Sequence, residues 1–220
     1  DLKLCLDTIS SIGTVPLDLS DVWLASGTSG KALGAYPGLA LVFFNHALQQ
    51  QPRRLPRCLD LGFHAANDGV PFTLNSNLVD ALHAALSRFD QPDPYAEIRE
   101  HSAWLRPRLR RLGYRIVAPD EIASPAVVTL ALPDSIRSRV IGDQAHDAGM
   151  LLGYESCYLL QRNWVQICMM GATTRKGLER VVEFLARWAP ELGAAAEGKE
   201  MSLAGAQSDQ GSGHEFATLR

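Results

Sequence analysis

The sequence predicts an α/β fold, in which part of a larger, mostly parallel sheet with helices comes first and a smaller α+β domain follows. In the first part, short apolar runs alternate with glycine-rich turns and a helical pattern, which is typical of strands covered by helices. The proline-marked segment 91–94 then precedes a long amphipathic helix and a mixture of strands and helices. We therefore expect residues 1–92 to form part of one domain, 93–192 a smaller α+β domain, and 193–220 a disordered tail.

Composition excludes several classes of partner. With 46% hydrophobic and 20% charged residues and a net charge of -3, the chain lacks the basic excess of a nucleic-acid-binding protein. Its apolar runs, such as Leu39–Phe44 and Ala126–Leu132, are far shorter than the roughly 20 residues that span a bilayer. We expect neither a nucleic-acid nor a membrane partner.

The cysteines are scattered without the spacing of metal ligands, and three lie in or beside apolar segments. They are Cys5, Cys58, Cys157 and Cys168. This pattern predicts buried free thiols in a reducing, cytoplasmic location, with neither a metal site nor disulfides.

The first two expected strands each lead to a polar side chain. The apolar run Leu2–Leu6 ends at Asp7 and a turn, and Val22–Leu24 leads into the glycine-rich turn Ala25–Gly34, which carries Lys31. If the two strands are parallel neighbours, Asp7 and Lys31 emerge at the carboxyl edge of the sheet, where open α/β sheets bind ligands. One crevice would then hold both groups.

Two chemistries use a lysine after a glycine-rich turn. A phosphate-binding P-loop needs glycine at the start and Ser or Thr after the lysine, but these positions are Ala25 and Ala32. The other chemistry is condensation of a desolvated, neutral amine with an aldehyde such as pyridoxal phosphate (PLP). That chemistry needs a carboxylate to keep the pyridine nitrogen protonated, and Asp7 is the candidate.

The elements after Lys31 follow from local patterns. Leu39–Phe44 is apolar throughout, as expected of a parallel strand covered on both faces. Asn45 can cap a short helix that ends before Pro52, and residues 52–70 have the composition of a loop or crossover. A helix is expected over Asn77–Phe89.

In the second part, the apolar spacing predicts a helix over Tyr95–Leu112, kinked at Pro107. Its arginines suit a solvated basic face better than an anion site; they are Arg106, Arg108, Arg110 and Arg111. The remaining expected elements are strands Tyr114–Val117, Ala126–Leu132 and Val165–Met169 and helices Ser135–Ala148 and Arg175–Trp188.

The order of these motifs resembles the class V aminotransferases of the fold-type I PLP enzymes, particularly their alanine-glyoxylate aminotransferase branch. The likeness extends over about residues 1–192 and is carried by residues 6–13 (LDTISSIG), 16–18 (PLD), 26–33 (SGTSGKAL), 37–42 (PGLALV), 71–73 (PFT) and 170–175 (MGATTR). It implies the C-terminal part of a PLP-transferase large domain followed by the small domain. Such enzymes carry a long segment before this point, so we expect the chain to be the C-terminal portion of a longer protein.

The resemblance also assigns roles to single residues. It implies that Asp7 bonds the pyridine nitrogen and that Lys31 forms the internal aldimine with PLP. Thr28, Ser29 and the backbone of Gly30 are then placed to contact the phosphate. In a homodimer, Thr73 would reach the phosphate of the partner subunit's cofactor; its alternative role is a capping hydroxyl at a helix start.

One position departs from the resembling enzymes. Where this chain has Gln166, they commonly carry an arginine whose guanidinium binds the substrate carboxylate through two hydrogen bonds. The neutral amide of Gln166 cannot form that charge-assisted pair. Gln166 remains the candidate substrate contact. Arg162 and Arg175 are either substitutes for the missing clamp or surface arginines.

Together with these residues, the resemblance implies a PLP-dependent aminotransferase that moves an amino group from an amino acid to an oxo-acid and needs an N-terminal segment as well. Lys31 would bind the cofactor and move the proton of the substrate α-carbon, while Asp7 would keep the pyridine nitrogen protonated. A lyase or desulfurase of the same class is an alternative, although desulfurases usually have His before the lysine and this chain has Gly30. The third possibility is a non-catalytic, dimerising remnant of the fold.

Overall fold

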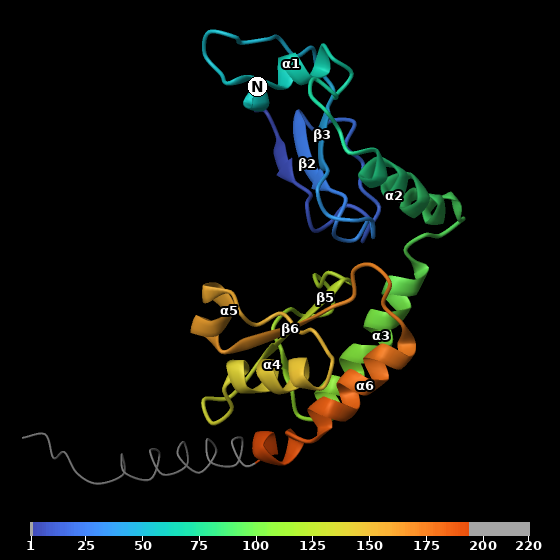
Figure 1. The fold of residues 1–220 in the computed structure, drawn as a ribbon. Helices are drawn as coiled ribbons and strands as arrows, with labels where there is room; N and C mark the ends of the chain where they lie inside the picture. Colours follow the sequence, from blue (N-terminus) through green and yellow to red (C-terminus); the bar gives the residue numbers. More distant parts are fainter. Residues whose placement is uncertain (1, 194–220) are drawn as a thin grey trace, which may run out of the picture. The chain divides into compact units, whose positions relative to one another are not determined.

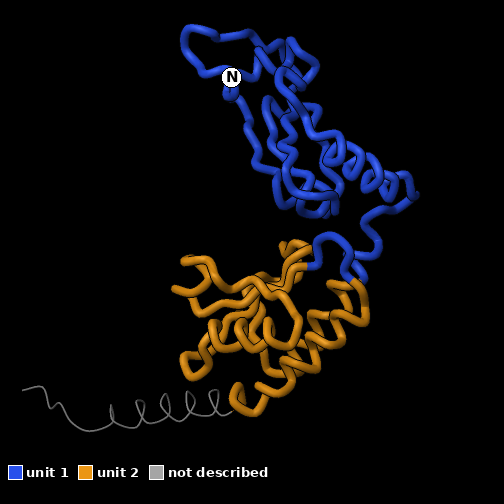
Figure 2. Tube along the Cα trace, viewed as in Figure 1, with its two compact units in different colours: residues 1–100, 169–173 blue, residues 101–168, 174–220 orange. Residues whose placement is uncertain are grey.

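The computed structural model describes residues 2–193, which divide into two compact units. Unit 1 holds the residues up to Glu100 together with Met169–Thr173, and unit 2 begins at His101 and holds the rest (Figure 2). The division lies within a helix, close to the proline-marked segment 91–94 where the sequence predicted a domain boundary. Apart from Gly193, the tail predicted to be disordered lies outside the described residues.

Unit 1 is built on a three-stranded sheet in the order β1 (Cys5–Asp7), β2 (Leu24–Thr28) and β3 (Ala40–Phe44), drawn in blue in Figure 1. β1 and β2 are parallel, with Asp7 opposite Ser26, so the predicted neighbouring pair is confirmed. β3 runs antiparallel to β2. The expectation of a parallel third strand is therefore wrong.

The exposure of β3 explains that error. Ala40, Val42 and Phe44 are exposed while Leu41 and Phe43 are half-buried, which is the alternation of a strand with one open face. A short, wholly apolar run is compatible with either arrangement, because hydrophobicity alone does not report strand direction. In the same region, β2 begins at Leu24, where the sequence predicted its end, so residues 25–28 of the expected glycine turn are strand.

The connection from β3 to the helices also differs from the prediction. Residues 45–50 form no helix; instead, the Asn45 side-chain amide donates to the Ser20 carbonyl oxygen at 2.5 Å. Within the predicted loop 52–70 lie a 3-10 turn, η1 (Arg57–Leu59), and a short helix, α1 (Leu61–Ala65). Buried Asp60 caps α1 by accepting from Phe63 N, a local signal that the sequence analysis missed.

The predicted helix in residues 77–89 is confirmed as α2 (Ser76–Leu86), followed by the 3-10 turn η2 (Ser87–Asp90). Although α2 is rich in Leu, Val and Ala, none of its residues is buried in the described structure. The exposed large apolar side chains of unit 1 include Val79 and Leu86 of α2 and, outside it, Leu4, Leu17, Val42, Phe44, Leu55, Leu59, Val70, Phe72 and Leu74. Unit 1 therefore leaves many large apolar side chains exposed.

Unit 2 has the expected α+β architecture. An antiparallel sheet in the order β4 (Arg115–Ile116), β5 (Val127–Ala131) and β6 (Trp164–Cys168) packs with helices. The helices are α3 (Ala96–Arg111), which contains Pro107, α4 (Ser138–Asp147), α5 (Cys157–Arg162) and α6 (Arg175–Ala186) (Figure 1). Of these, only α5 was not predicted.

The buried core of unit 2 draws on every layer. Its most deeply buried side chains include Leu105 and Leu109 from α3, Val128 and Leu130 from β5, Val165 from β6, Ile141 from α4 and Leu185 from α6. The buried hydroxyl of Tyr114 donates to the Leu185 carbonyl oxygen at 2.9 Å. Burial raises the pKa of Tyr114 far above its usual value, so the phenol stays protonated as a hydrogen-bond donor.

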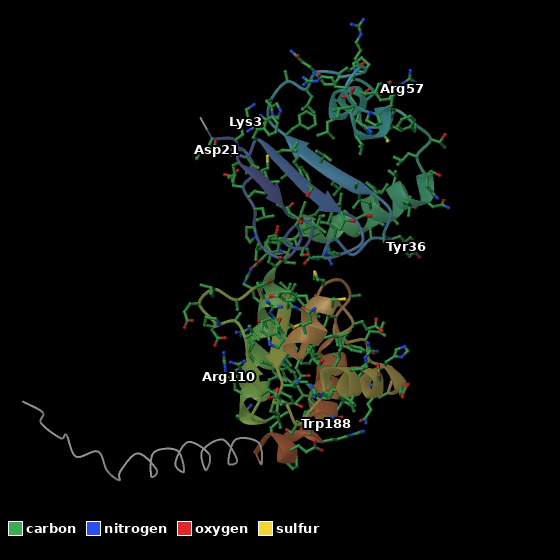
Figure 3. All side chains as sticks on the ribbon, turned by 90° about the vertical axis from the view of Figure 1, so that its left-hand side faces the viewer. Lys3, Asp21, Tyr36, Arg57, Arg110 and Trp188 are labelled. Carbon is green, nitrogen blue, oxygen red and sulfur yellow. The ribbon has the colours of Figure 1, made fainter. Side chains whose placement is uncertain are left out.

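Two surface expectations are wrong. Arg106 on α3 is only 5% exposed, and it donates to Asp120 Oδ1 and to the Ala118 carbonyl oxygen, each at 2.5 Å. Arg110, labelled in Figure 3, donates to the same carboxylate oxygen at 2.6 Å. The row of arginines is thus partly an ion-pair network rather than a solvated face. Likewise, all four cysteines are exposed rather than buried.

Within residues 2–193, each helix is too short or too polar to span a lipid bilayer. Over the same residues, no group of three or more His, Cys, Asp or Glu side chains is arranged to hold a metal ion.

Candidate functional site

Asp7 closes β1 at the carboxyl edge of the parallel strand pair. Its Oδ1 accepts from the Ile9 amide at 3.0 Å, so the carboxylate stabilises the turn that follows. Thr8, 2% exposed, ties this turn to β2 because its amide and its hydroxyl both donate to the Ser26 carbonyl oxygen, at 2.9 and 2.7 Å. These bonds fix the backbone of Asp7 against β2 while the carboxylate itself remains exposed.

Lys31 lies just after the end of β2, at the same edge. Its Nζ donates to Ser10 Oγ at 2.6 Å, and Ser10 belongs to the turn that follows Asp7. The following residues Ala32 and Leu33 are buried, which anchors the backbone beneath the exposed amine. The structure therefore brings the two predicted groups to one edge, with Ser10 as an unpredicted third member.

The environment of these groups differs from the expectation. The sequence predicted a desolvated amine in a crevice shared with Asp7, but Lys31 and Asp7 are both exposed in unit 1. Ser10 could have been noticed from the sequence, since it is a hydroxyl residue in the turn that begins at Asp7. Which of the two adjacent serines contacts Lys31 depends on the path of the turn, and the pattern does not give it.

The predicted phosphate contacts occupy the turn from Thr28 to Gly30. Ser29 is fully buried; its hydroxyl donates to the Tyr36 carbonyl oxygen at 2.7 Å and accepts from the Leu39 amide at 3.2 Å. This hydroxyl proton is used inside the turn, and the contact of Ser29 with a phosphate stays a prediction. Thr28 Oγ1 donates to the Leu39 carbonyl oxygen at 3.3 Å, a long bond that a better acceptor can replace.

Gly30 is required by packing. A Cβ atom at this position would lie 2.6 Å from both Cα and Cβ of Pro37, closer than side chains tolerate. The turn therefore folds back tightly on itself directly before Lys31. Its phosphate contact, like that of Thr28, stays a prediction.

Thr73 is exposed and precedes α2. The capping residue of α2 is Asn75, whose side chain accepts from the Asn77 amide at 2.9 Å. The alternative role of Thr73 as the capping hydroxyl is therefore wrong. Its contact with a partner subunit's cofactor stays a prediction.

An open pocket of about 810 Å³ lies beside this region in unit 1. The loop after Lys31 and one side of α2 line it, through Gly34, Ala35, Tyr36, Asn77, Asp80, Ala81, Ala84 and Ala85. Most of its lining side chains are small, and Asp80 is its charged lining residue. Tyr36, 69% exposed, is labelled in Figure 3.

The predicted substrate residues belong to unit 2. Gln166 on β6 donates from Nε2 to Thr129 Oγ1 at 3.1 Å, and its backbone pairs with Gly153. The guanidinium carbon of Arg162 lies 3.9 Å from the Tyr158 ring centroid, and that of Arg175 lies 4.5 Å from the Trp104 ring centroid. Both arginines therefore have aromatic partners within their own unit.

No family model matches the chain. It is similar to 2-aminoethylphosphonate–pyruvate transaminase of Pseudomonas fluorescens, at 25% identity over 204 residues, which cover 86% of this chain and 55% of that protein. The chain thus spans about half the length of this curated relative.

Solved structures agree with that similarity. An alanine–glyoxylate aminotransferase from Nostoc sp. superimposes with a TM-score of 0.71 at 22% identity, covering 84% of this chain and 53% of that one. A pyridoxamine-pyruvate aminotransferase from Mesorhizobium loti gives 0.71 at 21% identity, covering 94% and 58%. The predicted fold is therefore confirmed, because the chain superimposes on about half of each of these aminotransferase structures, and the findings agree with the resemblance to class V.

Proposed function

We propose that this chain is part of a PLP-dependent aminotransferase that transfers an amino group from an amino acid to an oxo-acid. The observation that carries the proposal is the parallel pairing of β1 and β2, which places Asp7 and the loop of Lys31 at one sheet edge. The similarity to transaminases supports it.

The residues at this edge fit PLP chemically. A primary amine can bind the aldehyde carbon, and a carboxylate can hold a protonated pyridine nitrogen. When bound, PLP supplies an aldehyde that condenses with amines and a ring that accepts the electrons of a deprotonated α-carbon. Asp7 uses Oδ1 for the turn, and no hydrogen bond to a described residue is found at its Oδ2.

Each residue then has a distinct task. Lys31 holds the cofactor and afterwards moves a proton at the substrate α-carbon, because an amine released from covalent attachment becomes a general base. Asp7 keeps positive charge on the ring nitrogen. Thr28 and the backbone of Gly30 bind the phosphate, whereas Ser29 shapes the turn that presents them.

We also propose that the protein acts as a homodimer. In support, α2 has no buried residue, and Phe72 and Leu74 beside Thr73 are about half exposed. A second copy covering this surface would exclude water from it and bring Thr73 to a neighbouring cofactor. The same cover would desolvate the exposed amine of Lys31.

The exposure of Lys31 and Asp7 also favours one competing function, a non-catalytic remnant that keeps the fold and dimerises. Adding PLP to the purified full-length protein, with the expected N-terminal segment, separates the two. The aminotransferase gives a visible absorption band that reduction with borohydride converts into a permanent adduct on Lys31. The remnant gives no band.

Two variants make that experiment specific. Lys31→Ala is expected to abolish the band and the adduct, whereas Lys176→Ala, in unit 2, is expected to keep both. Equal bands in the wild type and Lys31→Ala would mean that PLP reacts elsewhere, and the assignment of Lys31 would be wrong. A panel of amino donors with pyruvate or glyoxylate, including 2-aminoethylphosphonate, then tests transfer against lyase chemistry.

A further inference from the structure

The hydrogen bond between Lys31 and Ser10 joins two segments that are distant in sequence but packed at one edge. Nζ of Lys31 lies 2.6 Å from Ser10 Oγ, although both residues are exposed. Two exposed side chains lose conformational entropy when they hold one geometry, so such a contact needs a rigid support. The structure provides this support on both sides.

On the serine side, the turn is tied at several points. Thr8 binds the Ser26 carbonyl oxygen twice, and Thr14, 1% exposed, donates from its hydroxyl to the Ser11 carbonyl oxygen at 2.7 Å. Amides of the turn also bond back within it, including Ile12 N to the Thr8 carbonyl oxygen at 2.9 Å. Ser10 therefore stands on backbone that cannot shift independently of β2.

On the lysine side, Gly13 and Ala32 are in close backbone contact. A Cβ atom at position 13 would lie 3.0 Å from the Ala32 carbonyl carbon, so only glycine lets the two segments meet. Ala32 itself is 2% exposed. The turn that carries Ser10 and the segment that carries Lys31 are thus packed as one piece.

A serine hydroxyl suits both states of the amine. It accepts a hydrogen bond when the amine is an ammonium, and it can donate one when the amine is neutral. A carboxylate at this position would instead hold the amine in its charged form by ion pairing. Serine therefore orients Nζ without fixing its charge.

We propose that Ser10 is a positioning residue for Lys31, which restrains the amine at the edge shared with Asp7 before the amine meets an aldehyde. This inference rests on the proposed function. It predicts that removing the hydroxyl frees Nζ, so that Lys31 reacts faster with a small untargeted reagent and is captured more slowly by PLP.

The first test uses the protein without PLP. Limited acetylation with acetic anhydride, followed by peptide mass spectrometry, gives the rate at Lys31 relative to Lys176 in the same sample. Ser10→Ala is expected to raise this ratio about threefold, the effect of losing one solvent-exposed hydrogen bond. Ser10→Thr, which keeps the hydroxyl, and Ser11→Ala, which changes the neighbouring serine, are expected to leave it unchanged.

The second test follows formation of the visible band after PLP is added. Ser10→Ala is expected to slow it about threefold, since the amine is no longer held in place, and Ser10→Thr is expected to restore the rate. Urea unfolding of each variant shows that the fold is kept. If the Thr variant unfolds, Ser10→Cys replaces it as the variant that retains a weak acceptor for the Lys31 amine.

The two proposals fail in different ways. A wild-type protein without the band ends the proposed function, whatever the acetylation ratio. A wild-type protein with the band, whose Lys31 acetylation is unchanged in Ser10→Ala, ends the role of Ser10 alone. An equal rise in Ser11→Ala overturns that role too, because the effect would then come from the turn as a whole.

Discussion

Gly13 lies against the peptide group between Ala32 and Leu33, so a Cβ atom at position 13 would be 3.0 to 3.1 Å from that peptide's carbon, oxygen and nitrogen atoms. Its φ of +83° is also a conformation that L-residues rarely adopt. Gly13→Ala therefore combines backbone strain with a backbone clash. We expect it to lower the free energy of unfolding by about 2 to 4 kcal/mol, measured by urea denaturation.

Gly69→Ala is the matched control for that prediction. Gly69 lies in the same unit with a similar φ of +78°, but nothing lies within 4 Å of the Cβ that alanine would add. Strain alone should then cost about 1 kcal/mol. Equal losses in the two variants would show that the contact between residue 13 and Ala32 contributes no stability.

The contact between Gly13 and Ala32 separates what could be predicted from the sequence from what could not. The pattern placed Asp7 at a strand end and Lys31 in a glycine-rich turn, and the parallel pairing of β1 and β2, which the prediction took as its condition, is present in the structure. It did not give Ser10 as the partner of Lys31, because that bond depends on how closely the Gly13 turn approaches Ala32. Such packing is a tertiary property that periodicity does not encode.

Direction and burial limited the prediction of the fold. β3 was placed correctly as a strand but in the wrong orientation, since a wholly apolar run fits a parallel or an antiparallel neighbour equally well. Arg106 was assigned to a solvated face because the carboxylate that pairs with it, Asp120, lies beyond the end of its own helix. Helical spacing reports only contacts within one helix.

The ion-pair network around Asp120 makes the stability of unit 2 depend on pH. Hydrogen bonds from Arg110 and Arg106 lower the pKa of the Asp120 carboxyl from 3.8 to about 2. Because the pKa is depressed in the folded state, the stabilisation is complete above pH 3.8 and is lost as the pH falls toward 2. We expect Asp120→Asn to make unfolding less pH-dependent over this window, as measured by urea midpoints at several pH values.

Asp134→Asn serves as the comparison. Asp134 is an exposed aspartate of unit 2 that forms no ion pair with any described residue. Its replacement should leave the acid limb of the stability profile as in the wild type. If Asp120→Asn also leaves that limb unaltered, the arginines do not hold the Asp120 carboxyl in solution.

The remaining prediction concerns the neutral amide of Gln166. Its Nε2 donates to Thr129 Oγ1 at 3.1 Å. This position therefore offers an uncharged donor, where a guanidinium would offer two charged donors side by side. If substrate carboxylates meet this strand, Gln166→Arg should lower KM for simple α-amino acids about tenfold, the effect of one charge-assisted hydrogen bond. 2-Aminoethylphosphonate, which has no carboxylate, should gain less if its phosphonate does not occupy the same position.

Gln166→Met separates charge from shape in that experiment. Methionine keeps a flexible side chain of similar length but removes the donor, so it should give no improvement for any amino acid. An unchanged or higher KM in Gln166→Arg would show that the carboxylate binds elsewhere. Arg162 and Arg175 would be the next residues to replace, since each is held over an aromatic ring in unit 2 with a guanidinium that can still donate at its edge.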